Sequence, residues 1–497
     1  MYFFKNIISL FLIFKIINNF LILPFETIYI KDELIKNDDY YNILFQNELY
    51  TNISVSTPLQ EIKTLLKMDS SGFILYEGSF NYNLSTSIEK GTWDLNVGWQ
   101  WRQSSFPAKD YFYFSQLNSY KDLDMFKLEK EKKNLIKTNK TSFVIVQKKT
   151  QSSYSNKNFF YYGLIGLKLN ENSYSTIPEF VISLRKTKDI QSYTFSLKFN
   201  KDNYTYNDYF NNDNNGYFIV GEELTDDENE KNKIIYTDAQ KKGKYLTWYV
   251  FFDQIYSSIT NVIEKNNTDF YAKSTGAEFC VNLPYLIGTI EYLEYINQTF
   301  FKELIKEEIC YFNTKNNKRG LYSFICNRKS EIFIKYLNNS FPDLIFVSKE
   351  LEENFTLTKY DLFSLNNYNK SDTNIYFLVM FPPLHGFTNY YDWTLGIPFL
   401  KKYRLSFNYD TKKIGYYKYD GINNHNSNKT EEENSFNFFK STIFKIICII
   451  ILIIIIFILG MLFQKKCYGK KKKKAFELND DNYEYESYDN INNGINN

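Results

Sequence analysis

The sequence predicts a mostly β protein with two lobes, and three observations support this prediction. The chain has 497 residues, of which 44% are hydrophobic, and this is more than one small core requires. Between about residues 39 and 417, short aromatic and β-branched runs alternate with polar loops, over a length too great for a single β sandwich. Helical stretches are few, and residues 290–308 form the clearest one. The strand candidates are residues 49–55, 93–97, 143–146, 193–199, 217–220, 245–252 and 405–409.

The N-terminus has the architecture of a signal peptide. Lys5 is followed by an apolar run that continues to about residue 23, so we expect residues 1–24 to be the signal peptide, with cleavage between residues 23 and 26. The alternative is an uncleaved anchor helix, although Lys15 interrupts the apolar run and disfavours a spanning helix. Either alternative directs the chain into the secretory route.

A second apolar segment lies near the C-terminus. Residues 446–463 are uninterrupted and long enough to cross a bilayer core, and the basic cluster 470–474 marks the cytoplasmic side. We therefore expect a polar stalk at 419–442, one transmembrane helix at 443–463 and a disordered cytoplasmic tail at 464–497. This predicts a single-pass type I membrane protein of the secretory pathway, at the plasma membrane or in endolysosomes. Its ectodomain would be lumenal or extracellular, and the lipid bilayer would be a partner.

Charge and histidine content exclude several functions. The formal net charge is only +2, which gives no electrostatic footprint for a phosphate backbone, so we expect no nucleic-acid partner. The chain has two histidines, His385 and His425, which are too few for a histidine-based triad or a zinc cluster. We therefore expect no metal and no cofactor.

Sequons for N-glycosylation are spread along the chain, as in an exported glycoprotein. In a chain this rich in asparagine, many such triplets arise by chance, so the sequons do not by themselves establish export. They begin at Asn52, Asn83, Asn139, Asn203, Asn266, Asn297, Asn338, Asn354, Asn369 and Asn428.

Residues 50–72, which read YTNISVSTPLQEIKTLLKMDSSG, contain an ordered set of motifs. The turn Thr57-Pro58-x-Gln60 follows a strand candidate and is itself followed by an apolar strand candidate and the tripeptide Asp-Ser-Ser. This order resembles the opening of the pepsin-like aspartic proteases, which have a strand, a Gly-Thr-Pro-x-Gln turn, an apolar strand and Asp-Thr-Gly. Ser56 stands where the family has the first glycine.

The resemblance implies that Asp69 is the first catalytic aspartate. The tripeptide is Asp69-Ser70-Ser71, whereas the family has Asp-Thr-Gly or Asp-Ser-Gly. Serine at the second position is a common variant in the family. The third-position glycine lets the loop pack close to the active site, and we expect the side chain of Ser71 to strain that loop.

Four later segments resemble the same family, in the family's order. The last of them, at 393–416, is the most specific match and corresponds to the closing segment of the second lobe. The resemblance covers residues 39–417 and implies a bilobal pepsin-like fold with an interlobe cleft, an N-terminal lobe at 39–215 and a C-terminal lobe at 216–418. The segments are YYGLIGL at 161–167, FSL at 195–197, GYFIVG at 216–221 and WTLGIPFLKKYRLSFNYDTKKIGY at 393–416.

By the same resemblance, the second catalytic aspartate is replaced. Hydrolysis in this family uses two carboxylates that share one proton, one acting as a base toward water and the other as an acid toward the scissile carbonyl. The segment 279–285 fits the second signature and places Asn282 at the aspartate position. An amide cannot relay a proton, and loss of one acid–base partner costs about a hundredfold to ten-thousandfold. Leu283 and Pro284 also replace the hydroxyl residue and the glycine that brace the loop.

The flap that would cover the cleft departs from the family as well. Residues 93–98 resemble the family's strand that ends in Tyr-Gly, which places Val97 at the position of the flap tyrosine and Gly98 after it. Trp99 or Trp101 could cover the cleft instead, and the alternative that we favour is that they pack between strands.

Two other carboxylates lie near these motifs. Asp110 fits the acidic residue on the strand that returns from the flap, and we interpret it as structural. Glu278 alternates onto the same strand face as Asn282, so a displaced carboxylate could substitute for the missing aspartate. The alternative that we favour for Glu278 is a solvated carboxylate or one at a strand edge.

The chain has five cysteines, of which three fall in the predicted ectodomain. Cys448 lies in the predicted membrane helix and Cys467 in the predicted tail. Cys310 and Cys326 resemble the second-lobe disulfide of the family and would close a short loop. Cys280 would then remain as a buried free thiol.

These features predict a membrane-anchored pepsin-like homologue that is catalytically impaired or inactive and that retains a cleft for a peptide or protein ligand. Whether the protein is an enzyme stays open, because an active aspartic endopeptidase is the first alternative. The second alternative is a surface glycoprotein without a cleft ligand. Residues 26–41, which precede the first strand candidate, are not notably basic, and this disfavours activation by removal of a basic prosegment.

Overall fold

The computed structural model describes twelve segments of the chain, all in the first of two compact units, which spans residues 1–419. The second unit, residues 420–497, contains the predicted transmembrane helix and tail, so those predictions lie outside the described residues. In the described segments no helix is both long and apolar enough to span a bilayer. The segments are 20–29, 47–91, 105–115, 135–147, 162–169, 178–199, 214–222, 234–258, 274–314, 321–365, 373–383 and 392–417.

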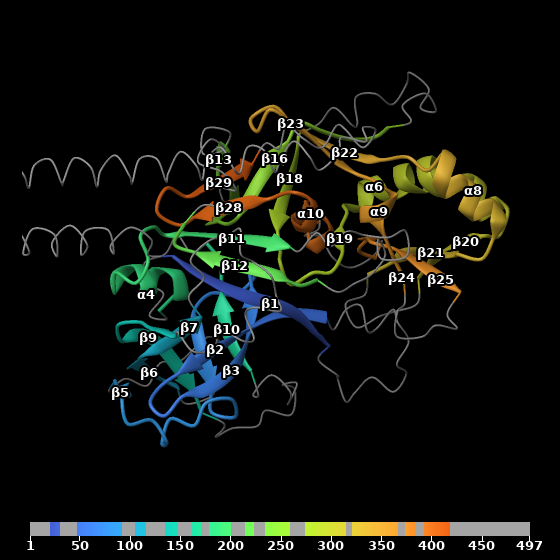
Figure 1. Ribbon diagram of the computed structural model, residues 1–497. Helices are drawn as coiled ribbons and strands as arrows, with labels where there is room; N and C mark the ends of the chain where they lie inside the picture. The colour runs from blue at the N-terminus through green and yellow to red at the C-terminus, as the bar shows by residue number, and fades with distance from the viewer. Residues whose placement is uncertain are drawn as a thin grey trace, which may run out of the picture. The chain divides into compact units, whose positions relative to one another are not determined.

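A 15-stranded sheet contains strands from both ends of this unit (Figure 1). Its strand order is β13-β29-β28-β11-β12-β1-β2-β3-β10-β4-β9-β6-β5, and β7 and β8 branch from β2. In this order the bounds are Ile234–Asp238, Lys413–Tyr417, Leu405–Asn408, Thr194–Phe199, Gly216–Val220, Leu21–Tyr29, Asn47–Val55, Gln60–Lys67, Gly163–Gly166, Phe73–Tyr76, Thr141–Val146, Ser105–Asp110 and Glu89–Lys90, with β7 at Phe112–Ser115 and β8 at Leu135–Lys137.

Smaller sheets and most of the helices belong to the second half of the unit. A five-stranded sheet has the order β16 (Tyr249–Phe252), β18 (Thr275–Phe279), β27 (Trp393–Leu395), β19 (Leu286–Ile287) and β26 (Val379–Met380). The other sheets are β17 (Gln254–Ser257), β22 (Leu344–Ser348) and β23 (Glu353–Leu357); β20 (Cys310–Asn313), β21 (Ser323–Asn327), β25 (Asn374–Phe377) and β24 (Phe363–Leu365); and β14 (Lys241–Lys242) with β15 (Tyr245–Leu246). The helices are α4 (Phe180–Lys186), α6 (Ile290–Ile296), η6 (Asn297–Phe301), α7 (Lys302–Lys306), α8 (Glu331–Asn339), α9 (Lys359–Leu362) and α10 (Ile397–Lys402).

Most of the predicted elements are confirmed. β2, β9, β11, β12 and β28 coincide with predicted strands to within two residues at each end, and the predicted strand 245–252 is divided into β15 and β16. The predicted strand 93–97 lies outside the described residues. The predicted helix 290–308 is confirmed as the continuous run α6, η6 and α7, whose middle turn is a π-helix.

Two hairpins join the halves of the unit. In Figure 1, β28, β11, β12 and β1 lie side by side, and β11 pairs with β28 in the antiparallel sense. Phe195 and Phe407 face each other across this pair, with stacked rings 4.9 Å apart. The rings of Trp248 and Tyr409 pack against Phe195, so an aromatic core stands at the junction. Burial of such large side chains stabilises the contact between the halves.

β1 lies inside the sheet, although the sequence predicts a signal peptide at residues 1–24. Residues 21–25 pair with β12, and residues 25–29 pair with β2. Phe25 is fully buried, and Leu21 and Leu23 are nearly so. β1 precedes residue 39, where the predicted N-terminal lobe begins, and the predicted cleavage range 23–26 falls within a paired strand. The apolar leader runs directly into an apolar strand, so composition does not change at the boundary.

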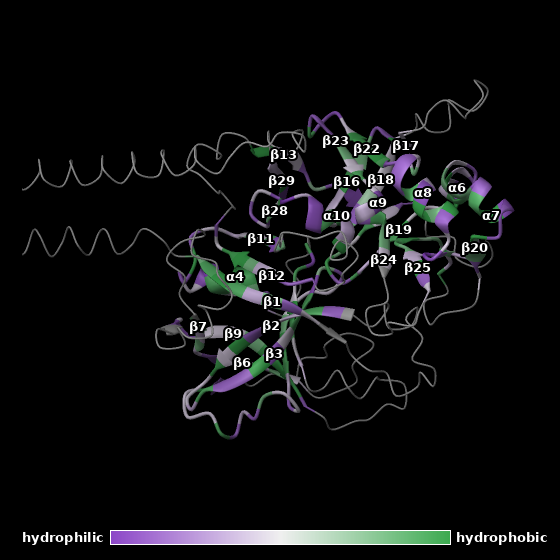
Figure 2. Ribbon diagram, turned by 45° about the vertical axis from the view of Figure 1, so that its right-hand side comes forward, coloured by the Kyte–Doolittle hydropathy of each residue, from purple (hydrophilic) through white to green (hydrophobic). Residues whose placement is uncertain are grey.

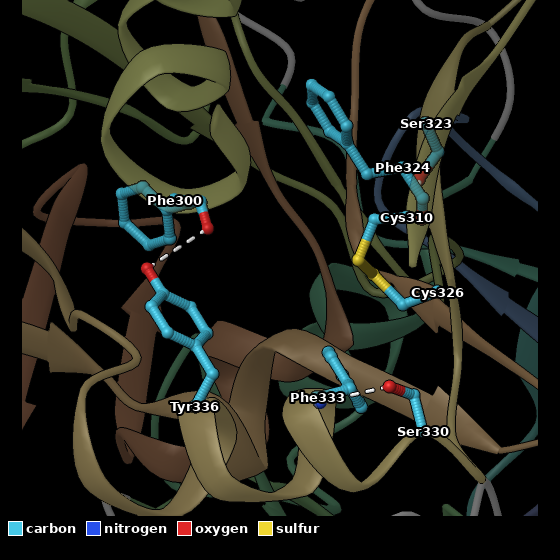
Figure 3. Close-up of a disulfide and its surroundings, with 8 residues drawn as sticks. All are labelled: Phe300, Cys310, Ser323, Phe324, Cys326, Ser330, Phe333 and Tyr336. Carbon is cyan, nitrogen blue, oxygen red and sulfur yellow. Dashed lines mark hydrogen bonds between the residues drawn. A yellow bond between two sulfur atoms is a disulfide. The ribbon is translucent and has the colours of Figure 1, made fainter. Parts of the chain in front are cut away.

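The predicted disulfide between Cys310 and Cys326 is confirmed (Figure 3). The two residues face each other on β20 and β21. Figure 3 places the bond beside Phe324, whose ring stacks on Phe301 at 4.2 Å. Cys280 is buried and forms no disulfide within the described residues, as expected.

Candidate active site

Two motifs of the same construction carry the predicted site residues. In the first, β3 leads through a loop at residues 68–72 to β4, while β10 runs parallel to β3 and antiparallel to β4. In the second, β18 leads through a loop at residues 280–285 to β19, while β27 runs parallel to β18 and antiparallel to β19. Asp69 and Asn282 therefore occupy equivalent positions, each in the loop after the first strand of its motif.

A glycine packs closely against the backbone of each of these loops. A Cβ atom on Gly166 would lie 2.5 Å from the carbonyl carbon of Ser71, and one on Gly396 would lie 2.3 Å from the carbonyl oxygen of Leu283. Both distances are too short for any side chain, so these positions require glycine. The loops also receive backbone hydrogen bonds, because the carbonyl oxygens of Ser70 and Leu283 accept from N–H groups just after the glycines.

The two loops bring Asp69 and Asn282 into direct contact. The side-chain amide of Asn282 donates a hydrogen bond to the carboxylate of Asp69, with Nδ2 and Oδ2 3.1 Å apart. Asn282 is only 3% exposed, whereas Asp69 is exposed. Two residues that are 213 positions apart in the sequence are thus in direct contact.

The amide of Asn282 also contacts the thiol of Cys280. Cys280 Sγ lies 3.0 Å from Asn282 Oδ1 and donates to it, and both side chains are buried. The amide oxygen can only accept and the amide nitrogen can only donate. With its oxygen held by the thiol, the amide presents its N–H group to Asp69. Cys280 was expected to be buried, but its contact with Asn282 was not predicted.

Ser71 does not strain the first loop, contrary to expectation. The residue with a positive φ in this loop is Gly72, at 94°, and Ser71 is not among the described residues with positive φ. The glycine that the conformation requires is thus one position later than the family motif places it. The hydroxyl of Ser70 donates to Asp69 Oδ1 at 3.1 Å. Together with the bond from Asn282 to Oδ2, this gives the carboxylate of Asp69 one hydrogen bond on each oxygen.

The second loop is apolar, and this agrees with the sequence. Leu283 is 5% exposed and packs in a cluster with Cys280 and Tyr285, and Pro284 is also buried. A hydroxyl residue at position 283 would have offered a hydrogen bond, whereas Leu283 contributes only packing. The loop is held by the cluster and by the backbone bond from Ile397 N to Leu283 O.

In the turn before β3, the conformation and hydrogen bonds of Ser56 and Gln60 explain the motif. Ser56 has a φ of 72°, in the left-handed region that favours the glycine of the family motif. Its hydroxyl donates to Pro58 O at 2.8 Å. The side chain of Gln60 donates to the backbone oxygen of Asn81 and accepts from its N–H group, so it holds the following loop against the turn.

Trp248 connects the two motifs, and the sequence analysis did not single it out for this role. Its indole Nε1 donates to the carbonyl oxygen of Leu167, 2.7 Å away, in a buried bond. Leu167 follows Gly166, behind the Asp69 loop, and its own N–H donates to Lys67 O. The carbonyl oxygen of Trp248 accepts from Phe279 N, just before the Asn282 loop. No pattern in the sequence indicates this pairing.

The two other carboxylates have structural contacts. Glu278 forms an ion pair with Lys242, with Oε2 and Nζ 2.9 Å apart, so it is engaged at a strand rather than beside Asp69. Asp110 is fully buried and accepts from the hydroxyls of Ser85 and Ser87 at 2.7 and 2.6 Å. These contacts support the structural interpretation of Asp110.

Several predicted residues lie outside the described segments. The flap residues Val97, Gly98 and Trp99 are among them, as are Trp101 and both histidines. Within the described segments, no group of three or more histidine, cysteine or acidic residues could hold a metal ion. The candidate site therefore consists of Asp69, Asn282 and the loop residues around them.

Comparison with solved structures identifies the architecture. The fold is similar to that of basic 7S globulin from soybean, with a TM-score of 0.51 over 80% of this chain and 95% of the globulin chain. The chain is mostly β, and this structural neighbour has a pepsin-like fold. Sequence identity to the globulin is only 11%, so the likeness concerns the fold alone. No family model and no curated protein matches the sequence.

The pepsin-like fold accounts for the duplicated loops and for the hairpins that join the two halves. The mostly β architecture that the motifs implied is thus present despite the low identity. The most specific sequence match, residues 393–416, forms β27, α10, β28 and most of β29. This segment supports the second motif through Gly396 and contributes Phe407 to the junction between the halves.

Proposed function

We propose that this chain is a membrane-anchored, pepsin-like homologue of the secretory pathway that holds an extended peptide between its lobes and hydrolyses it poorly or not at all. The hydrogen bond from Asn282 Nδ2 to Asp69 Oδ2 is the observation that carries the proposal. It supports a site in which the geometry of the two loops is kept while only one of the two facing groups is a carboxylate.

The chemistry of the amide explains the proposed loss of activity. In a pair of aspartates, one carboxylate takes a proton from the attacking water while the protonated partner donates to the scissile carbonyl. Asp69 could still accept a proton from a water molecule. Asn282 has no acidic proton to deliver, and its oxygen already accepts from the thiol of Cys280. The reaction would therefore lack its general acid.

The same groups are suited to binding an extended peptide. Each oxygen of Asp69 already accepts one hydrogen bond, and a carboxylate has further lone pairs for N–H donors. Asp69 is exposed, so those lone pairs are accessible to a ligand. A peptide backbone supplies N–H groups at regular spacing, and an uncleaved peptide would remain bound. The proposed ligand is thus a peptide or an extended protein segment.

The proposed compartment is supported by the disulfide between Cys310 and Cys326, because such bonds persist in oxidising compartments and are rare in the cytosol. The apolar segments at 1–24 and 443–463 add the predicted entry signal and membrane anchor. In this proposal the described unit is lumenal or extracellular.

An active aspartic endopeptidase is the second candidate, because the carboxylate of Asp69, in contact with Asn282, is the kind of group that a working pair would need. A single set of assays on the full chain in detergent separates the candidates. We would measure binding of a fluorescent peptide library and cleavage of the same library from acid to neutral pH, with Asp69→Ala as the control.

We expect binding without significant cleavage. Acid cleavage that disappears in the Asp69→Ala variant would establish the endopeptidase instead. Absence of both binding and cleavage would favour a surface glycoprotein without a cleft ligand.

A further inference from the structure

A pocket of about 480 Å³ lies in the second half of the unit, away from Asp69 and Asn282. It is bounded by the helical run of α6, η6 and α7 and by strands β20 and β21. Phe312 and Phe324 provide an apolar floor, and their rings are 4.9 Å apart. Polar side chains also line the pocket, and Figure 2 shows both hydrophilic and hydrophobic residues along α6 and α7. The volume falls in the range of small-molecule sites.

A possible modification site faces this pocket. Asn297 lines it and is the first residue of the sequon Asn297-Gln298-Thr299. Among the described residues, the side-chain amide of Asn297 has no hydrogen-bond partner. The neighbouring Gln298 is bonded instead to Glu294, with Nε2 and Oε1 2.7 Å apart. The reactive nitrogen of the sequon is thus available beside an open pocket.

We propose that Asn297 carries an N-linked glycan and that this pocket holds the proximal sugar of that glycan. The inference rests on the secretory routing in the proposed function. Transfer from a polyprenyl-diphosphate-linked oligosaccharide forms a bond between Asn297 Nδ2 and the anomeric carbon of the first sugar. The bond from that carbon to the diphosphate breaks, the lipid diphosphate leaves with the electron pair, and the amide loses one proton.

The rim of the pocket matches the chemistry of a sugar ring. Tyr311 is 53% exposed at the rim, and the face of its ring attracts the polarised C–H groups of a saccharide. Lys302 supplies N–H donors, and the carboxylate of Glu294 supplies acceptors for hydroxyl and acetamido groups. The apolar floor accommodates the remaining face. A covalently attached sugar also enters the pocket without the entropy cost of free association.

Two other sequons provide comparisons. Asn139 is exposed, but its Nδ2 donates to Thr187 O at 2.9 Å and to Asp189 Oδ1 at 3.2 Å. A glycan there would remove one of these bonds, so we expect the folded protein to carry no glycan at Asn139. Asn83 lies exposed in a turn, and no pocket residue is near it in the sequence. Asn83 therefore serves as a reporter of entry into the secretory pathway.

Site-resolved mass spectrometry on the full chain from eukaryotic cells is the first test. We expect glycans at Asn297 and Asn83 and none at Asn139. The second measurement is the rate of nitration of Tyr311. We expect nitration to be several-fold slower in the wild-type protein than in Asn297→Gln, and to remain slow after enzymatic trimming to a single sugar.

Matched variants control for altered folding. Thr299→Ala should lose the glycan and the protection of Tyr311, whereas Thr299→Ser should keep both, and Asn83→Gln should leave the nitration of Tyr311 unchanged. A glycan at Asn83 without one at Asn297 would overturn this inference and leave the secretory routing intact. Absence of glycans at both positions would overturn both proposals. Equal nitration of glycosylated protein and Asn297→Gln would show that the sugar lies outside the pocket, or that something else occupies it, and would also overturn the inference.

Discussion

Asn282 and Asp69 face each other across the two loop motifs and share a hydrogen bond of 3.1 Å between Nδ2 and Oδ2. The side chain of Asn282 thus faces Asp69 as the second aspartate of a catalytic pair would, but it is an amide and not a carboxylic acid. An amide and a carboxyl group have nearly the same shape, so the substitution removes proton transfer without requiring the loops to move. This separation of geometry from chemistry can be tested directly.

The first prediction concerns restoration of the pair. Wild-type protein should cleave peptides negligibly, and Asn282→Asp should gain weak cleavage at acid pH because two carboxylates would again share a proton. The triple variant Asn282→Asp, Leu283→Thr, Pro284→Gly should recover more, since misplacement by about 1 Å costs on the order of a hundredfold. Turnover of a peptide library would be measured for each variant, with thermal unfolding to detect the packing lost at Leu283.

Adding Asp69→Ala to each of these variants should abolish the gained activity. Full activity from Asn282→Asp alone would show that Leu283 and Pro284 do not impair the loop. Cleavage by the wild-type protein that depends on Asp69 would contradict the proposed function itself.

The second prediction concerns Trp248. Trp248→Phe leaves the buried carbonyl oxygen of Leu167 without its donor, so the free energy of unfolding should fall by about 1–3 kcal/mol more than the loss of ring volume explains. Trp393→Phe is the matched control, because Trp393 is fully buried and its Nε1 has no hydrogen-bond partner among the described residues. Urea unfolding of both variants measures the difference. Equal losses of stability would mean that the bond to Leu167 contributes nothing.

The third prediction concerns pH. Burial raises the pKa of Glu179 from 4.5 to about 7, against the opposing effect of Lys186. Glu179 is 7% exposed, and among the described residues its Oε2 has no hydrogen-bond partner. Because the folded protein holds this proton more tightly than the unfolded chain, the contribution to stability is complete below pH 4.5. It is lost as the pH rises from 4.5 to about 7, by about 3 kcal/mol in total.

Glu179→Gln should remove this pH dependence, because glutamine is neutral throughout. Urea midpoints of the variant and the wild-type protein should therefore diverge between pH 4.5 and about 7, with the variant the more stable at neutral pH. Parallel curves across that range would mean that Glu179 titrates normally in the folded protein.

The sequence predicted much of this site because short motifs with fixed geometry carry it. Asp69 and Asn282 were placed from local patterns, and Gly166 and Gly396 occurred in matched segments because any side chain there would collide with the loops. Cys310 and Cys326 were paired by the same resemblance and are bonded. In each case, a steric or covalent requirement restricts the residue type, and this restriction is what a sequence can show.

Other contacts were missed because they join single residues with no shared pattern. The bond from Trp248 to Leu167 spans 81 positions, and a tryptophan in a β-rich segment is usually only a packing residue. Cys280 was expected to be a buried free thiol, and its hydrogen bond to Asn282 was not predicted. The expected strain at Ser71 was wrong because Gly72 takes the left-handed conformation one residue later.

The last prediction concerns the N-terminal strand, where the expected cleavage range of 23–26 conflicts with the pairing of β1. Residues 21–25 pair with β12 and residues 25–29 pair with β2, so β1 separates two strands that would otherwise be sheet edges. Removing β1 would leave the backbone groups of both strands unpaired, and exposed edges promote aggregation. We therefore expect any processing of the leader to occur before Leu21.

N-terminal sequencing of the protein from eukaryotic cells would locate the first residue of the mature chain. We expect it at or before residue 21, and a chain that begins at residue 30 should aggregate or unfold at lower urea than one that begins at residue 20. Phe25→Asp should have a similar effect in the full chain, because it places a charge in a fully buried position. A stable mature protein that begins at residue 26 or later would show that the sheet does not need β1. It would also support cleavage within the range 23–26 that the sequence indicates, because the folded protein could then lose β1.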